Sequence, residues 1–219
     1  MVHSFPTRRS SDLVASWAGE LDTFLNTTRD NVLEKVRECW SSLFTPRAIF
    51  YRHEKGLIDA YVSVAVVIQK MIQSEISGIA FTVHPVTEDP NQMIIEAGFG
   101  LGEAIVSGQI TPDSYIITKD DMSIFDINIG HQTKKLNLAC RQSKVKSQKS
   151  KVDEETNEWI NLNEEQGRKQ KLSGKQIIEM AEVCKQIEKH YGFPCDIEWA
   201  MEGGEIFITQ SRPITTLQK

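Results

Sequence analysis

Short apolar segments rich in β-branched residues are the feature of this sequence that most constrains its fold. Three such segments follow one another closely, at Val62–Met71, Ser77–Val83 and Gln92–Ala97. Segments of this length and composition, bounded by turn residues, are typical of buried β-strands. Two further strands are predicted at Ser114–Thr118 and Ser123–Ile129. The chain is therefore expected to build a sheet in which strands and helices are mixed rather than strictly alternating.

Helices are predicted on both sides of these strands. Apolar residues recur at helical spacing over Asp30–Phe44, with the aspartate as N-cap. Thr45, followed by a proline, predicts the start of a second helix, which stops near Gly56. A long helix capped by Ser173 has one apolar face and ends at Gly192. Together with the strands, these helices predict an α+β fold.

Composition and charge exclude several classes of protein. The 219 residues suffice for one large domain or two small ones. A net charge of −5 argues against a general nucleic-acid binder, which needs a basic excess. The longest apolar run, around Val62–Ile68, is too short to cross a membrane. The four cysteines form no CxxC pair, so neither a zinc site nor a redox motif is predicted and a reducing cytoplasm is the expected location.

A long polar stretch, Leu136–Lys171, separates the predicted strands from the long helix. It carries a basic run at Lys144–Lys151, followed by an acidic run at Asp153–Glu155. Charge runs of this kind are typical of solvated surface. We therefore expect a solvated excursion rather than a binding patch, and the acidic run argues further against nucleic acid.

The first thirteen residues, Met1–Leu13, differ from the rest of the sequence because they are basic and lack periodicity. Arg8–Ser11 would suit a targeting peptide, but the stretch is too short and lacks an apolar core. His3–Leu13 also matches one reading frame of a common sequencing-library adapter. We therefore expect residues 1–13 to be foreign to the protein or disordered, and residues 14–219 to form the domain.

The C-terminal part of the chain predicts a β-hairpin, formed by Asp196–Met201 and Glu205–Arg212. A carboxylate, Glu198, lies inside the first apolar strand, and Gln210 and Arg212 lie in the second. Charged groups in apolar strands are costly unless they are paired or bind a ligand. These three residues are therefore candidates for a site.

The hairpin loop decides which of these side chains share a face. A three-residue loop at Glu202–Gly204 places Glu198 opposite Ile208 and on the same face as Gln210 and Arg212. The other face is then filled by Ile197, Trp199, Met201 and Phe207. A two-residue Gly-Gly loop would instead put Glu198 and Gln210 on opposite faces. A same-face oxygen pair beside an arginine suits Mg²⁺ and a phosphate, and the alternative is a salt bridge on the sheet surface.

Two weaker signals accompany the hairpin. Glycines in Gly98–Gly108 could let the backbone approach an anion, but Glu103 replaces the third glycine of the dinucleotide fingerprint and no Walker A sequence is present. By itself the segment fits a structural turn as well as a phosphate loop. Gln69–Met71 ends the first apolar strand and could contact an adenine, with ordinary core packing as the alternative.

Several separate motifs, in the same order, together resemble the ATP-binding domain of the pyruvate-phosphate dikinase and phosphoenolpyruvate synthase family. Rifamycin phosphotransferases carry a closely similar domain. The resemblance runs from about Ser16 to Leu217. The segments that carry it are SWAGELDTFLN (16–26), CWSSLFTPRAIFYR (39–52), VVIQKM (66–71), SGIAFTVHPVT (77–87), IIEAGFGLGEAIVSGQITPDSY (94–115), YGFPCDIEWA (191–200) and ITQSRPITTL (208–217).

The resemblance implies an ATP-grasp fold, in which ATP lies between two α+β lobes and is split to AMP and inorganic phosphate. The β-phosphoryl group passes to a histidine on a separate swivelling domain and then to pyruvate, or to rifamycin in the related enzymes. The activity implied is a phosphotransferase of the pyruvate, water dikinase type that uses ATP and Mg²⁺.

The motif match also implies roles for individual residues. Gly19 and Thr23 would belong to the loop over the phosphates, and Gln69 would lie at the adenine. Glu198 and Gln210 would hold Mg²⁺ while Arg212 clamps phosphate oxygens, which makes these three the implied catalytic residues. Glu96 and Glu103 would border the site.

The sequence departs from the family pattern at both ends. The upstream lobe with its phosphate-binding lysine, the arginine segment and the phosphohistidine domain are absent. We therefore expect an N-terminally truncated ATP-grasp domain that is inactive alone and whose partners are the phosphohistidine and acceptor-binding domains. The alternatives are the same domain of a rifamycin phosphotransferase, or a non-catalytic interaction fragment.

Overall fold

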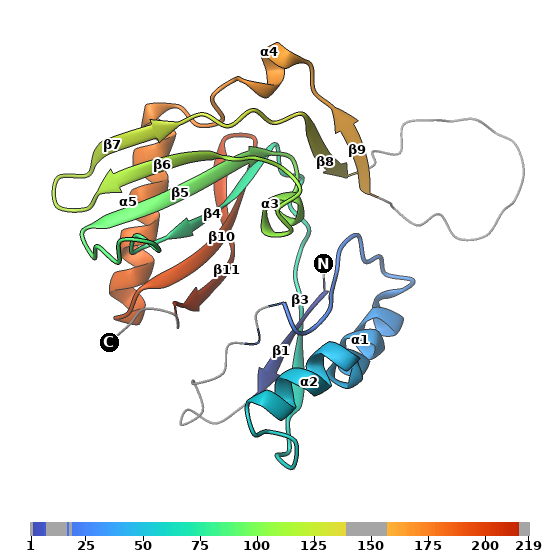
Figure 1. The fold of residues 1–219 in the computed structure, drawn as a ribbon. Coiled ribbons are helices and arrows are strands. Elements are labelled where there is room, and N and C mark those ends of the chain that lie inside the picture. Colours follow the sequence, from blue (N-terminus) through green and yellow to red (C-terminus); the bar gives the residue numbers. More distant parts are fainter. Residues whose placement is uncertain (1, 8–16, 18, 139–156, 215–219) are drawn as a thin grey trace, which may run out of the picture. The chain divides into compact units, whose positions relative to one another are not determined.

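The computed structural model describes residues 2–7, 17, 19–138 and 157–214, and these residues form two compact units (Figure 1). Unit 1 comprises Met1–Met71 and Arg141–Thr156, and unit 2 comprises Ile72–Cys140 and Asn157–Lys219. Both units combine helices with antiparallel strands, as the predicted α+β class requires. Among the described helices, none is both long and apolar enough to cross a membrane.

Unit 1 contains a three-stranded sheet in the order β2-β1-β3 and two α-helices joined by a short 3₁₀ helix. Thr45 caps the second helix as predicted, since its hydroxyl accepts a hydrogen bond from the Ala48 N–H. The first helix begins one residue later than expected, with Asn31 rather than Asp30 as N-cap. The elements are β1 (Val2–Thr7), β2 (Thr23–Phe24), α1 (Val32–Ser41), η1 (Ser42–Phe44), α2 (Pro46–Glu54) and β3 (Ser63–Ile68).

The N-terminal residues are part of this sheet. Strand β1 (Val2–Thr7) runs antiparallel to β3 along its whole length, from Val2 opposite Ile68 to Thr7 opposite Ser63. Residues 2–7 are therefore paired with a neighbouring strand, which supplies backbone partners that periodicity within the segment does not reveal. That residues 1–13 are foreign to the protein stays a prediction. Residues 8–13 lie outside the described part of the chain.

Unit 2 is built on a six-stranded antiparallel sheet in the order β11-β10-β4-β5-β6-β7. All the strands predicted for this region are present, with ends shifted by one or two residues. Their bounds are β4 (Ile76–Phe81), β5 (Gln92–Phe99), β6 (Asp113–Thr118), β7 (Ser123–Asn128), β10 (Cys195–Glu202) and β11 (Glu205–Pro213).

One face of this sheet is covered by α5 (Gly174–Tyr191), which crosses it in Figure 1. The helix begins and ends as predicted, with a capping box at Ser173 and a left-handed Gly192. Its apolar face packs on buried side chains of the strands, among them Trp199. Gly78 makes room for that indole, since a Cβ there would lie 2.6 Å from the ring. The opposite face of the sheet carries no such helix in the described part of the chain.

The polar stretch from Leu136 to Lys171 is not simply solvated. Its ends form β8 (Lys134–Leu138), β9 (Asn157–Asn161) and the short helix α4 (Glu164–Gly167), and β8 pairs with β9. Lys171 is fully buried in an ion pair with Asp113, with 2.8 Å between Nζ and Oδ1. The prediction of a solvated excursion holds for most residues of β9 and α4, which are exposed, but it is wrong for the buried Leu136 and Lys171. The basic and acidic runs lie outside the described residues.

Candidate functional site

The C-terminal hairpin places Glu198 directly opposite Gln210. The loop contains two residues, Gly203 and Gly204, because Glu202 pairs with Glu205. The predicted three-residue loop, with Glu198 opposite Ile208, is therefore wrong. A β-bulge between Glu198 and Trp199 adds one residue to β11 and restores the shared face that a regular two-residue loop would have destroyed.

The bulge also decides which side chains of β11 face the core. Trp199 lies opposite Ile208, and both contact the core beneath α5. Phe207 lies opposite Ala200, so it shares the face of Glu198 and not the core face that we predicted for it. Compared with the predicted three-residue loop, the two-residue loop moves the residues of β11 before the bulge by one position relative to β10. Each of these side chains therefore lies on the opposite face of the sheet from the one predicted.

A row of side chains crosses the open face of the sheet at the level of Glu198. The paired positions run from Gln210 through Glu198, Ile79 and Glu96 to Ser114. Glu198 and Glu96 are two strands apart, which is about 10 Å between their backbones. This face therefore carries two half-buried carboxylates and an amide, while apolar residues line the face beneath α5.

Burial controls the electrostatics of both carboxylates. It raises the pKa of Glu96 and is also the main reason that the pKa of Glu198 is raised. For Glu198, the nearby Arg212 guanidinium lowers the pKa and the Asp196 carboxylate raises it. Within the described part of the chain, no protein donor forms a hydrogen bond or ion pair with the Glu198 carboxylate. The Glu198 carboxylate oxygens are therefore available to bind a metal ion, because no cationic side chain of the described residues contacts them directly.

Arg212 lies one residue pair along the hairpin, opposite Asp196. Its Nε and Nη2 both lie 2.7 Å from Oδ2 of that carboxylate. Arginine has five N–H donors, so this ion pair fixes the guanidinium on the same face as Glu198 and leaves donors for an anion. Asp196 was not singled out from the sequence, because its position opposite Arg212 depends on the β-bulge, and neither loop length considered from the sequence places it there.

The glycine segment after β5 is held rigidly by side chains from other elements. The buried Gln132 accepts a hydrogen bond from the Phe99 N–H and donates one to its carbonyl, both at 2.8 Å. The Ser77 hydroxyl donates to the Gly100 carbonyl at 2.6 Å. Gly100 has a positive φ of 95°, and a Cβ there would lie 2.3 Å from the Leu136 carbonyl. These contacts make the segment a structural turn at the end of the sheet.

Glu103 follows this segment as the first residue of α3 (Glu103–Val106) and is exposed. Its carboxylate accepts a hydrogen bond from Asn157 Nδ2 on β9, at 3.4 Å. Glu96, by contrast, faces the same side of the sheet as Glu198. Of the two glutamates that the resemblance placed at the border of the site, Glu96 therefore shares its sheet face.

The other candidate residues belong to unit 1. Gly19 lies in an exposed turn with a positive φ of 72°, and Thr23 is an exposed residue of β2. Gln69 follows the last residue of β3 and is half-buried. The structure therefore brings Glu198, Gln210 and Arg212 together within unit 2. The other three candidates, Gly19, Thr23 and Gln69, all belong to unit 1.

The donor set on the open face fits a hard cation. Among the described residues, no group of three or more His, Cys, Asp or Glu side chains is placed to hold a metal ion. Mg²⁺ does not need such a cage, because it keeps several waters and is commonly bound through one or two protein oxygens together with substrate phosphates. Glu198 and Gln210 provide that number of oxygens, and Arg212 lies beside them for an anion.

Comparison with known proteins identifies the family of this chain. The family model for the pyruvate phosphate dikinase AMP/ATP-binding domain matches residues 7–219. This chain belongs to that family. Within the family, it is 47% identical over 206 residues to a probable phosphoenolpyruvate synthase of Archaeoglobus fulgidus and 43% identical over 211 residues to a phosphoenolpyruvate synthase of Pyrococcus furiosus. Each of these matches covers 94% of this chain and 25% of the relative.

A second group of relatives in the same family consists of rifampicin phosphotransferases. The chain is 40% identical over 220 residues to a rifampicin phosphotransferase of Bacillus cereus, a match that covers 98% of this chain and 24% of the relative. The chain thus spans about a quarter of the length of the curated relatives it matches. The predicted family is confirmed, and with it the similarity to both groups.

Proposed function

We propose that this chain is the ATP-binding module of a phosphoenolpyruvate synthase-like dikinase, with an ATP-grasp fold and a place in the cytoplasm. The observation that carries the proposal is the half-buried Glu198 carboxylate, set opposite Gln210 beside the ion-paired Arg212 on one sheet face. Membership of the AMP/ATP-binding domain family supports ATP as the ligand of that face. In this proposal the module splits ATP to AMP and inorganic phosphate and supplies a phosphoryl group to a histidine on a separate domain.

The residues of the hairpin would divide the work by their chemistry. Glu198 and Gln210 would hold Mg²⁺, which when bound neutralises phosphate charge during phosphoryl transfer. Arg212 would bind phosphate oxygens through the donors that its ion pair with Asp196 leaves over, and that pair would hold the guanidinium in place. The low solvent exposure of the sheet face would strengthen each of these contacts.

Residues of unit 1 would complete the nucleotide site. Gly19 and Thr23 would cover the phosphates and Gln69 would bind the adenine, as the resemblance implies. The positive φ of Gly19, and the absence of heavy atoms of the described residues within 4 Å of its Cβ position, suit a backbone turn that closes over a ligand. We further propose that the chain alone gives no net turnover, because the phosphohistidine and acceptor-binding domains would lie elsewhere in the full-length protein.

The final acceptor distinguishes the two named groups of relatives. Pyruvate is the acceptor that we propose, and rifampicin is the alternative that the Bacillus relative supports. A non-catalytic interaction fragment is the third candidate, and the intact Glu198, Gln210 and Arg212 argue against it. Measuring AMP formation by the full-length protein with pyruvate, with rifampicin and with neither acceptor separates the three.

The decisive experiment on the module is an NMR titration of the 219-residue chain with Mg-ATP. We expect Mg²⁺-dependent shifts of backbone amides in β10 and β11, with the Glu198→Ala variant weakening the affinity by about 100-fold or more because a direct metal ligand is lost. Glu205→Ala is the matched control, since that glutamate is exposed at the turn of the same hairpin. Shifts that appear elsewhere, or that survive Glu198→Ala unchanged, would refute the proposed site.

A further inference from the structure

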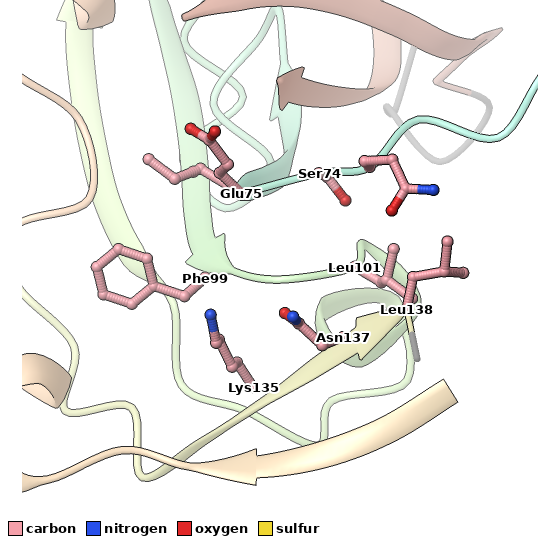
Figure 2. Close-up of a pocket in the computed structure, with 9 residues that line it drawn as sticks. Ser74, Glu75, Phe99, Leu101, Lys135, Asn137 and Leu138 are labelled. Atoms are coloured by element: carbon pink, nitrogen blue, oxygen red, sulfur yellow. The ribbon is translucent and has the colours of Figure 1, made fainter. Parts of the chain in front are cut away.

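We propose that unit 2 contains a second binding site, for a small organic carboxylate, in the cavity behind the glycine segment. The cavity has a volume of about 340 Å³ and lies between the end of the six-stranded sheet and strand β8 (Figure 2). Small-molecule sites begin at roughly this size. It is lined by Gln73, Ser74, Glu75, Ile76, Phe99, Leu101, Lys135, Asn137 and Leu138.

This cavity is separate from the face that carries Glu198. Ile76 on β4 pairs with Met201 on one side and Phe99 on the other, so all three lie in a row of the helix-covered face. Glu198 and Glu96 project from the opposite face of the same strands. A ligand in the cavity would therefore not occupy the proposed nucleotide site.

Three polar side chains of the cavity wall have no partner within the described part of the chain. The Lys135 ammonium forms no ion pair there, and neither the Asn137 amide nor the Ser74 hydroxyl forms a hydrogen bond. Ser74 is only 9% exposed, so its hydroxyl is largely withdrawn from solvent. Figure 2 shows Lys135 and Asn137 projecting from β8 toward the chain that carries Ser74. A cation, an amide and a hydroxyl that converge on a cavity are the donors that an anion requires.

The surroundings select a monoanion with an apolar part. Among the described residues that line the cavity, Lys135 is the one cation, and Figure 2 shows the Glu75 carboxylate pointing away from it. The remaining wall includes Ile76, Phe99, Leu101 and Leu138, which offer hydrocarbon contacts. One positive charge beside an apolar wall suits an organic carboxylate better than a phosphate dianion. A volume of 340 Å³ equals that of about ten water molecules in the liquid, which accommodates a ligand of similar heavy-atom count.

The cavity shares its wall with the glycine segment. The Gly100 N–H donates to the Glu75 carbonyl at 3.0 Å, and the Leu101 N–H donates to the Leu136 carbonyl at 2.8 Å. The glycine segment follows strand β5, and this strand carries Glu96 on the face opposite the cavity. A carboxylate bound by Lys135 and Asn137 would thus rest against the backbone that ends this strand.

The test is a titration of the 219-residue chain with sodium benzoate, followed by ¹³C-methyl NMR of Ile76, Leu101 and Leu138. We expect these methyl resonances to shift with a Kd on the order of 1 mM, because so small a ligand makes few contacts. Benzamide, the neutral analogue of the same shape, should give no comparable shift. Lys135→Gln should weaken benzoate binding by about tenfold or more, because it removes the cationic donor from the described part of the cavity wall.

The adjacent residue provides the matched control. The Lys134 ammonium lies 3.9 Å from the centre of the Trp159 ring rather than in the cavity wall, so Lys134→Gln removes the same charge from the same strand and should leave benzoate binding unchanged. Equal losses in both variants would show unspecific charge attraction and overturn the proposal. Shifts of the same resonances by benzamide or by inorganic phosphate, or no shift with benzoate, would overturn it as well.

Discussion

At the scale of the residue, the features that suit Glu198 to bind a cation also make it unfavourable for folding. Its pKa is raised above the ordinary value of 4.5, mainly because burial disfavours the charged form. The folded chain therefore binds this proton more tightly than the unfolded chain does. The protonated Glu198 side chain therefore stabilises the folded chain relative to the charged one. This stabilisation is fully present below about pH 4.5 and is lost as the pH rises through the folded pKa.

Glu198→Gln should therefore stabilise the fold at neutral pH, because the amide removes the buried negative charge and keeps the shape of the side chain. The gain in free energy of unfolding should shrink as the pH falls below the raised pKa, where the wild-type carboxyl is itself neutral. Urea unfolding of both proteins at neutral and acid pH measures this, with Glu205→Gln at the exposed turn as control. A variant less stable than wild type at neutral pH would contradict it.

The same residues show how far sequence reasoning reaches at this scale. The alternation of polar and apolar residues in the hairpin correctly placed Glu198, Gln210 and Arg212 on one face. The loop length behind that argument was wrong, and the bulge at Thr209 compensated for the error. Bulges leave no reliable local signal because their position depends on packing against the neighbouring strand. For the same reason Phe207 was assigned to the wrong face.

At the scale of the element, the Asp113–Lys171 pair joins β6 to the chain between α4 and α5. The Lys171 ammonium contacts Asp113 at 2.8 Å and also donates to the carbonyls of Gly130 and Gly167. The Asp113 carboxylate in turn accepts hydrogen bonds from the Tyr115 hydroxyl and from backbone N–H groups. Both side chains are fully buried, so neither can exchange its partner for water.

Lys171→Met should therefore lower the free energy of unfolding by about 3–5 kcal/mol, because it leaves the Asp113 carboxylate buried without its cation. Lys175→Met is the control, since the ion pair of Lys175 with Glu179 is exposed on α5 and its loss should cost about 0.5 kcal/mol or less. Urea unfolding of the two variants gives both values. Similar small losses in both would show that the buried pair contributes little.

Elements with a strong periodic pattern were predictable, and those without one were not. The long helix and its caps follow from spacing that is local to the sequence, as do the strands of the large sheet. Strands β8 and β9 and the burial of Lys171 could not be predicted in this way, because their stabilising partners are Gly100, Asp113 and other residues remote in the sequence. A charged residue in a polar run is ordinarily solvated, and only the tertiary structure shows the exception.

At the scale of the whole molecule, the core of unit 2 is independent of unit 1. Every member of the main hydrophobic cluster lies between Ile76 and Ile208, and all of the strands of the six-stranded sheet come from the same unit. The cluster includes Trp199, which is only 1% exposed. A unit with its own closed core has what a domain needs to fold alone.

Residues 72–219 alone should therefore fold cooperatively, with urea unfolding reported by the emission of the buried Trp199. The same piece should bind Mg-ATP more weakly than the whole chain, because Gly19, Thr23 and Gln69, which we propose to contact the phosphates and the adenine, belong to unit 1. Benzoate should still bind, since the cavity lies wholly within unit 2. Circular dichroism, urea titration and the two ligand titrations on one sample measure all three properties. Undiminished Mg-ATP affinity would show that the nucleotide site needs no residue before Ile72, and a piece without cooperative unfolding would show that residues 72–219 do not fold without the preceding part of unit 1.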